Sequence, residues 1–120
     1  MKNLNLRRGD VVIVNLDGAK DHEKQGIRPA VIISNEIMNE SSNNIIVAPM
    51  TSAVHKKRLL PSHVLIVASE YSGLNRDSVV QLEDVRSITK NRVINHIGCL
   101  TKVEVDKVDT RIGTVFFSHL

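Results

Sequence analysis

Short runs of β-branched and other apolar residues recur along most of the chain, and polar, turn-rich segments separate them. Runs of this length and composition are typical of β-strands that are buried in a small domain. We expect Pro49 to end the third run, because proline has no amide hydrogen to donate to a strand ladder. The pattern predicts strands at residues 11–16, 29–33, 45–48, 63–67, 78–82 and 85–88, followed by an extended segment at 93–97.

The polar segments between the predicted strands differ in character. Residues 17–27 form a loop that is long for so small a domain, and long loops often carry function. Residues 52–58 end in three consecutive cationic side chains and predict a basic loop. Short helical turns are expected within residues 35–44 and at residues 89–91.

The last part of the chain has a different period. Thr101 and Glu104 have the spacing of a capping box, in which each side chain bonds to the other residue's backbone amide. Apolar residues then recur at helical spacing, at Val105, Val108, Ile112, Val115 and Phe116. We therefore predict an amphipathic helix over residues 102–117, packed on the sheet. The whole pattern indicates a mainly β fold with minor α content, built as a small, strongly bent sheet or barrel.

Composition indicates one globular domain spanning residues 1–120. The chain has 120 residues, of which 42% are hydrophobic, and it shows no repeat or linker. No apolar run is long enough to span a bilayer, and residues 1–8 lack the apolar region of a secretory signal. We therefore expect a cytoplasmic protein with no membrane partner. The net charge of +3 is compatible with a polyanionic partner, but the scarcity of aromatic residues argues against a base-stacking platform.

Several kinds of site are disfavoured by the residues present. Cys99 is the only cysteine, so it can form neither an internal disulfide nor a thiolate metal cluster, and we expect a small buried apolar residue rather than a nucleophile. The five histidines do not have metal-ligand spacing. There is no phosphate-binding glycine loop and no serine in a nucleophile elbow. We therefore expect no metal and no cofactor.

Several segments, taken in order, carry a resemblance that none carries alone. They are Arg8–Val11, Glu23–Ile33 with its E-x-x-G-x-R-P pattern, Ile46–Ser52, Leu60–Val64 and Arg76–Ile88. Together they resemble the MazF/PemK family of toxin endoribonucleases, over about residues 7–117. The resemblance implies an SH3-like barrel with a C-terminal helix, a fold shared with CcdB-type toxins. It also implies a homodimer, a groove for single-stranded RNA at the dimer interface, and an acidic antitoxin that blocks this groove.

The resemblance implies that Arg28 and Thr51 are the central catalytic pair and that Glu23 assists them. An arginine can hold two phosphate oxygens and stabilise the charge that develops during RNA cleavage. The Thr51 hydroxyl can donate to a phosphate oxygen or orient the 2′-OH, and the Glu23 carboxylate can act as general base. From the residues alone, a surface salt bridge, a strand-end turn and a solvated loop charge remain alternatives for Arg28, Thr51 and Glu23.

Further residues are expected to contact RNA because they lie in the two loops or beside the R-S-I segment at 86–88. Some relatives carry an arginine and an aspartate where this chain has Gln81 and Glu83, so their acid–base arrangement cannot be copied intact. Glu83 is a weaker candidate for the base, and a plain surface charge cluster is the alternative. The expected RNA-binding set is His22, Lys24, Gln25, Ser52, Lys56, Lys57, Gln81, Glu83 and Arg86.

The sequence thus predicts a toxin that cleaves single-stranded RNA at a specific short sequence without a metal, through attack of the 2′-OH. The products would carry 2′,3′-cyclic phosphate and 5′-OH ends. Two rivals remain open at this point, namely a CcdB-like gyrase poison and an SH3-like RNA-binding module that does not cut. The same fold can host all three functions.

Overall fold

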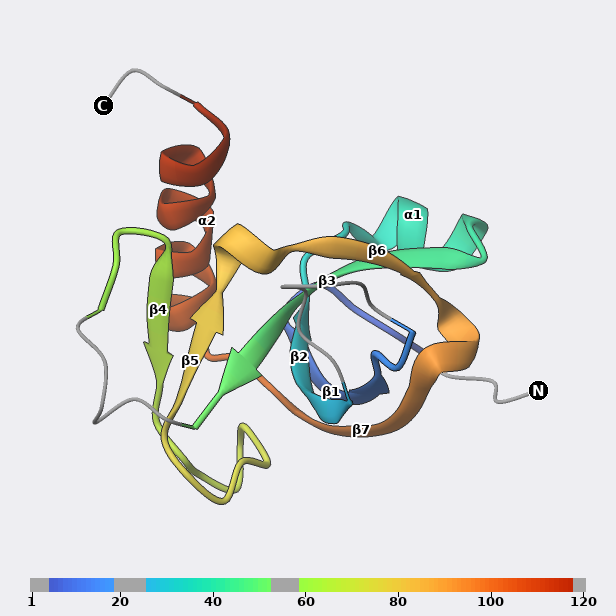
Figure 1. The fold of residues 1–120 in the computed structure, drawn as a ribbon, viewed down its shortest axis with the longest axis horizontal. Coiled ribbons are helices and arrows are strands. Elements are labelled where there is room, and N and C mark those ends of the chain that lie inside the picture. The colour runs from blue at the N-terminus through green and yellow to red at the C-terminus, as the bar shows by residue number, and fades with distance from the viewer. Residues whose placement is uncertain (1–4, 19–25, 53–58, 118–120) are drawn as a thin grey trace.

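The structure is a computed structural model that describes residues 5–18, 26–52 and 59–117 (Figure 1). None of the helices in this part of the chain is long and apolar enough to cross a membrane. The elements are β1 (Asp10–Asn15), β2 (Ile27–Ile32), α1 (Glu36–Ser41), β3 (Asn44–Thr51), β4 (His63–Ile66), β5 (Ser78–Gln81), η2 (Leu82–Asp84), β6 (Arg86–Thr89), η3 (Lys90–Arg92), β7 (Val93–Cys99) and α2 (Lys102–Phe116).

The seven strands in the described part of the chain belong to one antiparallel sheet. Its order is β4-β5-β3-β2-β1-β7, and β6 pairs with β3 beside this path. Figure 1 shows β1, β2, β6 and β7 curving around a common centre, with β4, β5 and α2 to one side. The described residues contain no pairing between β4 and β7, the two ends of the path. The prediction of a bent, mainly β fold with a C-terminal helix is therefore confirmed.

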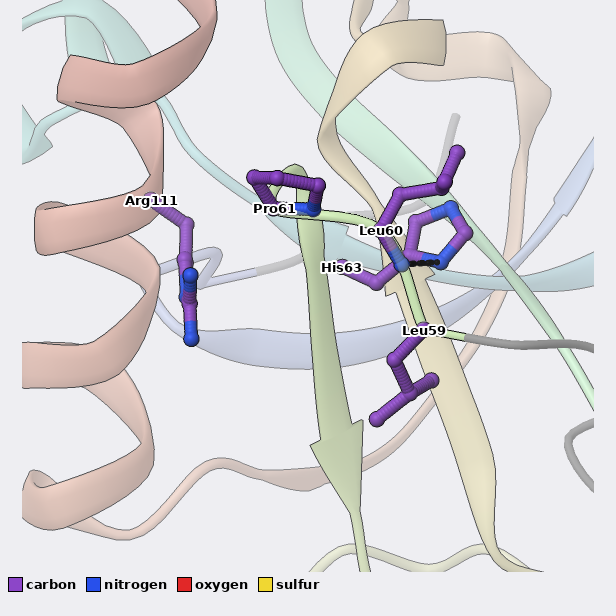
Figure 2. A pocket seen from close by; sticks show the side chains of 5 residues that line it. All are labelled: Leu59, Leu60, Pro61, His63 and Arg111. Carbon is purple, nitrogen blue, oxygen red and sulfur yellow. Dashed lines mark hydrogen bonds between the residues drawn. The ribbon is translucent and has the colours of Figure 1, made fainter.

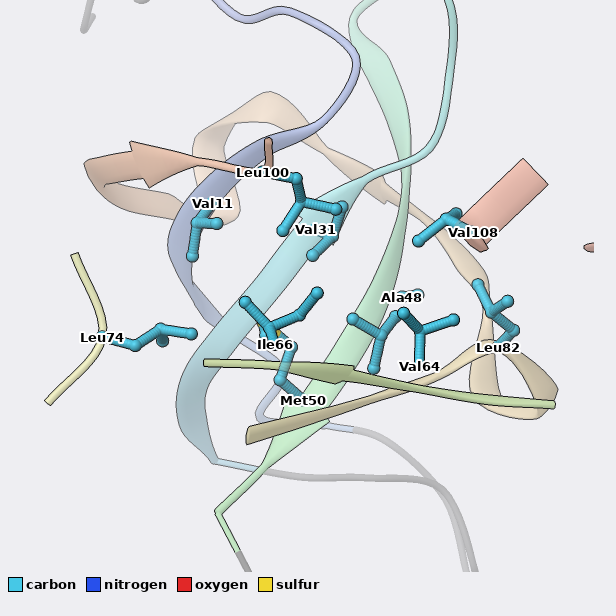
Figure 3. Packing of buried hydrophobic residues seen from close by; sticks show 11 residues of the cluster. Val11, Val31, Ala48, Met50, Val64, Ile66, Leu74, Leu82, Leu100 and Val108 are labelled. Carbon is cyan, nitrogen blue, oxygen red and sulfur yellow. The ribbon is translucent and has the colours of Figure 1, made fainter. Parts of the chain in front are cut away.

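Both faces of the central strands are buried, which explains why their sequences are nearly continuous apolar runs. Side chains at Val11, Val31 and Ala48 face the layer made by β4, β5 and α2, where they form the cluster drawn in Figure 3. Their neighbours in sequence, including Val12 and Ile32, point to the opposite face and form a second cluster with residues of β3, β6 and β7. The sheet therefore lies between two cores.

The predicted strand ends need one correction, at Pro49. This residue does not end the third strand, because β3 continues to Thr51. On one edge β3 pairs with β6 up to Val47, and from Met50 onward it pairs with β5. Pro49 lies at this change of partner, where no ladder bond is required of it on that edge, so its missing amide hydrogen costs little.

The other elements lie close to their predicted positions. A helix within 35–44, a helical turn near 89–91 and the extended segment after it correspond to α1, η3 and β7. Cys99 is only partly buried, at the end of β7, rather than a fully buried residue. Barrel closure and the loops at residues 19–25 and 53–58 lie beyond what the described residues test.

The predicted capping box is present at the start of α2. The Thr101 side chain accepts from the Glu104 amide at 3.2 Å, and the Glu104 carboxylate accepts from the Thr101 amide at 2.9 Å. Arg8 also ties this helix to the sheet, because its guanidinium group bonds both to Asp109 and to the Ile33 carbonyl. The helix thereby covers the core of Figure 3.

Replacing Thr101 with alanine is expected to lower the free energy of unfolding by about 1 kcal/mol, because the Glu104 amide loses the hydroxyl oxygen that caps it. Urea denaturation of the purified protein measures this loss. Thr101→Ser keeps the hydroxyl oxygen and should stay close to wild type. Equal losses in the two variants would show that the capping bonds contribute little.

Candidate functional site

Arg28 and Thr51 lie at the same end of two neighbouring strands. The ladder between β2 and β3 pairs Ala30 with Pro49, and two further residues along each strand lead to Arg28 and Thr51. Side chains two residues apart share a face of a strand. Both residues therefore lie on the face of Ala30, at the rim of the second core, and both are half-buried. The sheet register brings together the two residues that the sequence predicted as the catalytic pair.

The loop predicted to carry the base starts and ends beside Arg28. Asn15 pairs with Ile27 in the β1–β2 hairpin, and the Leu16 amide donates to the Gly26 carbonyl at 2.9 Å. The hairpin loop therefore rises from the same end of the sheet as Arg28. Its predicted site residues, namely His22, Glu23, Lys24 and Gln25, lie outside the described residues.

Arg92 holds the base of this hairpin, and the sequence reasoning missed it. One of its guanidinium nitrogens donates to the Asn15 carbonyl at 3.1 Å and to the Asp17 carbonyl at 2.8 Å. Arg92 is separated from these residues by 75 or more positions. No local pattern signals such a contact.

The second predicted loop begins directly after Thr51. Ser52 is exposed there, which is compatible with an RNA contact. Lys56 and Lys57 lie outside the described residues. The chain is described again from Leu59, and it enters β4 at His63.

Gln81 ends β5 and Arg86 opens β6, and η2 lies between them in the chain. The Gln81 side chain is 3% exposed, and its carboxamide oxygen has no hydrogen bond to any described residue. Arg86 opens β6 and is half-buried, opposite Val47 of β3. Such burial leaves Gln81 little surface to offer to RNA.

Glu83 is held by two side chains of the segment that leads into β4. The Ser62 hydroxyl donates to one carboxylate oxygen at 2.8 Å, and His63 Nε2 lies 2.9 Å from the other. Partial burial raises the pKa of Glu83, but the bonds from His63 and Ser62 outweigh it, so the pKa is lowered overall. Glu83 is therefore ionised at neutral pH, and both of its oxygens accept hydrogen bonds.

An open groove of about 480 Å³, lined in part by His63, lies beside this segment (Figure 2). One side comes from the segment that enters β4, and Arg111 of α2 lines the opposite side. Leu59 and Leu60 are about half exposed here, at 47% and 50%. The described residues contain no group of three or more His, Cys, Asp or Glu side chains arranged to hold a metal ion.

Comparison with known sequences identifies a family and several relatives. The family model described as "PemK-like, MazF-like toxin of type II toxin-antitoxin system" matches residues 7–116. The Endoribonuclease MazF of Staphylococcus saprophyticus is 38% identical over 114 residues, which are 95% of this chain and 93% of that protein. The Endoribonuclease EndoA of Bacillus subtilis is 41% identical over 104 residues, covering 87% of this chain and 88% of that protein.

Solved structures agree with these sequence relatives. The Mycobacterium tuberculosis toxin MazF-mt6 has a TM-score of 0.75 at 26% identity, covering 92% of this chain and 99% of that one. MazF from Deinococcus radiodurans has a TM-score of 0.81 at 20% identity, covering 97% and 100%. A mycobacterial endoribonuclease crystallised with its cognate antitoxin has a TM-score of 0.78 at 20% identity, covering 96% and 98%.

Proposed function

Since this chain belongs to the family of PemK-like, MazF-like toxins of type II toxin–antitoxin systems, we propose that it is an endoribonuclease that cleaves single-stranded RNA. Relatives that are named endoribonucleases and are about 40% identical over most of the chain support this assignment. They favour an enzyme over a gyrase poison or a binding module that does not cut. The cleavage would be specific for a short sequence, read on the exposed edges of unstacked bases.

The proposed reaction uses the nucleophile that RNA itself carries. Glu23 removes the proton of the 2′-OH, and the oxygen attacks the adjacent phosphorus. Arg28 holds two phosphate oxygens and stabilises the negative charge that builds up on them. The Thr51 hydroxyl donates a hydrogen bond to the same phosphate group. The bond to the 5′ oxygen then breaks and that oxygen takes up a proton, so the products have 2′,3′-cyclic phosphate and 5′-OH ends.

One observation carries this proposal, namely the register that sets Arg28 and Thr51 at the same end of β2 and β3. A phosphate seated at this end would meet a guanidinium group and a hydroxyl from two rigid strands. Groups held on strands need little reorganisation when the reaction begins. The hairpin loop that carries Glu23 in the sequence starts and ends at the same place.

Two loops would supply most of the RNA contacts. We assign base reading to His22, Lys24 and Gln25 in the hairpin loop. Ser52, Lys56 and Lys57 in the second loop would bind the backbone, since cationic side chains attract phosphates without regard to sequence. Arg86 completes the proposed set, whereas Gln81 is too deeply buried to offer RNA much surface. A different role is argued below for Glu83.

The finer points of architecture and assembly belong to the same proposal. The curvature of β1, β2, β6 and β7 and the burial of both sheet faces support closure as an SH3-like barrel. We propose that two such barrels form a homodimer with the RNA groove between them, in the cytoplasm.

An acidic antitoxin is the expected protein partner. Structural relatives have been crystallised with a cognate antitoxin or with MazE. A groove that is built for a polyanion also suits an acidic peptide, and a disordered segment can order itself on binding there. Such a partner would inhibit the enzyme by occupying the place of RNA.

Incubation of the purified protein with a long mixed-sequence RNA in EDTA tests the proposed function. We expect discrete cuts at one short sequence, with cyclic-phosphate and 5′-OH ends identified by enzymatic end-labelling and mass spectrometry. Loss of cutting in EDTA would contradict the proposal that the reaction needs no metal ion. Intact RNA with and without added Mg²⁺ would overturn the assignment as an endoribonuclease.

A further inference from the structure

The strand order makes the segment after Thr51 an unusual connection. β3 and β4 both run antiparallel to β5, which lies between them, so β3 and β4 are parallel to each other. The chain must therefore leave the end of β3, pass β5 and re-enter the sheet at the start of β4. Residues 52–62 make this crossover, and they include the basic run at Lys56 and Lys57.

The far end of the crossover is tied to η2 through side chains and backbone. His63 and Leu60 exchange two bonds, since the His63 amide donates to the Leu60 carbonyl at 2.9 Å and the Leu60 amide donates to His63 Nδ1 at 3.1 Å (Figure 2). The Leu82 amide donates to the Ser62 carbonyl at 3.1 Å. Glu83 then accepts from Ser62 and from His63. We call Ser62, His63 and Glu83 the clasp.

The hydrogen-bond partners of His63 indicate which of its ring nitrogens carries the hydrogen. Nδ1 accepts a hydrogen bond from an amide, so in the neutral ring the hydrogen is on Nε2, where it points at the Glu83 carboxylate. The His63 side chain is only 5% exposed, whereas the Glu83 side chain is 37% exposed, so the imidazole ring is shielded from water. Glu83 thus accepts two hydrogen bonds within the protein.

We propose that Glu83 is a positioning residue for RNA binding, acting through Ser62 and His63. This inference rests on the proposed endoribonuclease function. By holding the clasp, Glu83 fixes His63, where the chain re-enters the sheet six residues after Lys57. In the sequence, Lys56 and Lys57, which are proposed to bind the RNA backbone, lie between Thr51 and this fixed point. Glu83 needs two acceptor contacts for this task and no proton transfer.

Two substitutions at this position separate the positioning role from acid–base chemistry. Glu83→Ala removes both contacts. Glu83→Gln keeps the geometry, because the amide oxygen can accept from His63 Nε2 while the amide nitrogen donates to the Ser62 oxygen. A residue that acts as a base cannot be replaced by an amide, whereas a residue that only holds its neighbours can.

The RNA cleavage kinetics of these variants test the proposal. For Glu83→Ala we expect KM to rise about tenfold with kcat within about twofold of wild type, because a less ordered segment must be immobilised on binding. Glu83→Gln should restore KM to within about twofold of wild type. Ser62→Ala, which removes one contact and disturbs the fold least, should give an intermediate KM. Glu40→Ala on α1 is the matched control for loss of an exposed carboxylate.

Two outcomes would overturn the positioning role. A Glu83→Gln protein as impaired in kcat as Glu83→Ala would show that the charge or the proton matters. A wild-type KM in folded Glu83→Ala or in Ser62→Ala would show that the clasp does not influence RNA. Circular dichroism of each variant establishes that it is folded, and Ser62→Ala decides the question where Glu83→Ala does not fold.

Failure of the proposed function is recognised separately. The same variants are titrated with a 2′-O-methylated RNA, which has no nucleophile and cannot be cut. If the wild-type protein binds this RNA but does not cut normal RNA, the endoribonuclease assignment fails. The positioning role of Glu83 is then still tested, because Glu83→Ala should raise the dissociation constant about tenfold. A wild-type protein that neither binds nor cuts overturns both proposals.

Discussion

Replacing Arg28 with alanine should lower kcat/KM for RNA cleavage by about 10² to 10³-fold, the range seen when one fixed donor to a developing anion is removed. Arg28 is the cation placed at the end of β2, where the register aligns it with Thr51 of β3. Its loss leaves the charge on the phosphate oxygens without its strongest partner. Single-turnover cleavage with excess enzyme measures the effect on the chemical step.

Arg7→Ala is the matched control for this prediction. Arg7 is exposed and precedes Gly9, whose amide donates to the Ile32 carbonyl at the opposite end of β2. Its removal should change cleavage by less than about twofold, since exposed charges away from a site act weakly through water. Arg28→Lys retains the charge but not the planar pair of donors, and it should recover only part of the activity. Near-normal cleavage by Arg28→Ala would contradict the proposed role.

The largest expected effect on stability is that of Gly73→Ala. Gly73 has φ +74°, and a Cβ atom there would lie 2.0 Å from the Ile97 carbonyl oxygen of β7. Backbone cannot move away as a flexible side chain can, so the added methyl group forces the turn off the sheet. With the strain of a left-handed conformation, we expect a loss of about 3 kcal/mol in the free energy of unfolding. The thermal midpoint should fall by about 10 °C.

Gly18→Ala separates the cost of the left-handed backbone conformation from the cost of the contact with β7. Gly18 also has a positive φ, at +92°, but the atom nearest to a Cβ placed there is a nitrogen of the Arg92 side chain, at 3.9 Å. This variant should lose only about 1 kcal/mol, the cost of the backbone conformation alone. Differential scanning calorimetry of the two proteins gives the comparison. Equal losses would show that contact with β7 is not the reason for glycine at position 73.

The turn before β5 is sensitive because it packs against β7 through its backbone. Ser72 is 2% exposed, and its hydroxyl bonds to backbone groups of the same turn, including the Leu74 amide at 3.2 Å. The Cys99 amide of β7 donates to the Tyr71 carbonyl at 3.0 Å. These contacts hold the turn close to the strand and leave no room for a side chain at Gly73.

Local elements could be predicted from the sequence because their causes lie within a few residues. The capping box of Thr101 and Glu104 acts over one helical turn, and the apolar spacing that follows it needs only the period of the helix. Strands are marked by β-branched runs in the same way. Pro49 shows the limit of this reasoning, since only its place between two partner strands makes a proline acceptable.

The candidate site could be named from the sequence only through a family resemblance. Spacing along the chain does not place Arg28 near Thr51, which is 23 positions away by residue number. Their common end of the sheet follows from the β2–β3 register. The sequence predicted Glu83 as an RNA contact and a weaker candidate for the base. Its two bonds to Ser62 and His63 could not be predicted, because they depend on how β4 and η2 pack.

The sequence by itself determined the strands, the terminal helix and its cap, because propensity and periodicity act between near neighbours. Tertiary structure alone decided which distant groups meet, as with Arg92 at the hairpin base, the clasp around Glu83 and the contact of Gly73 with Ile97. These contacts join residues far apart in the chain, and their geometry exists only when the sheet has formed. The physical reason is that side-chain chemistry is local, whereas the alignment that puts it to use depends on strand order and register.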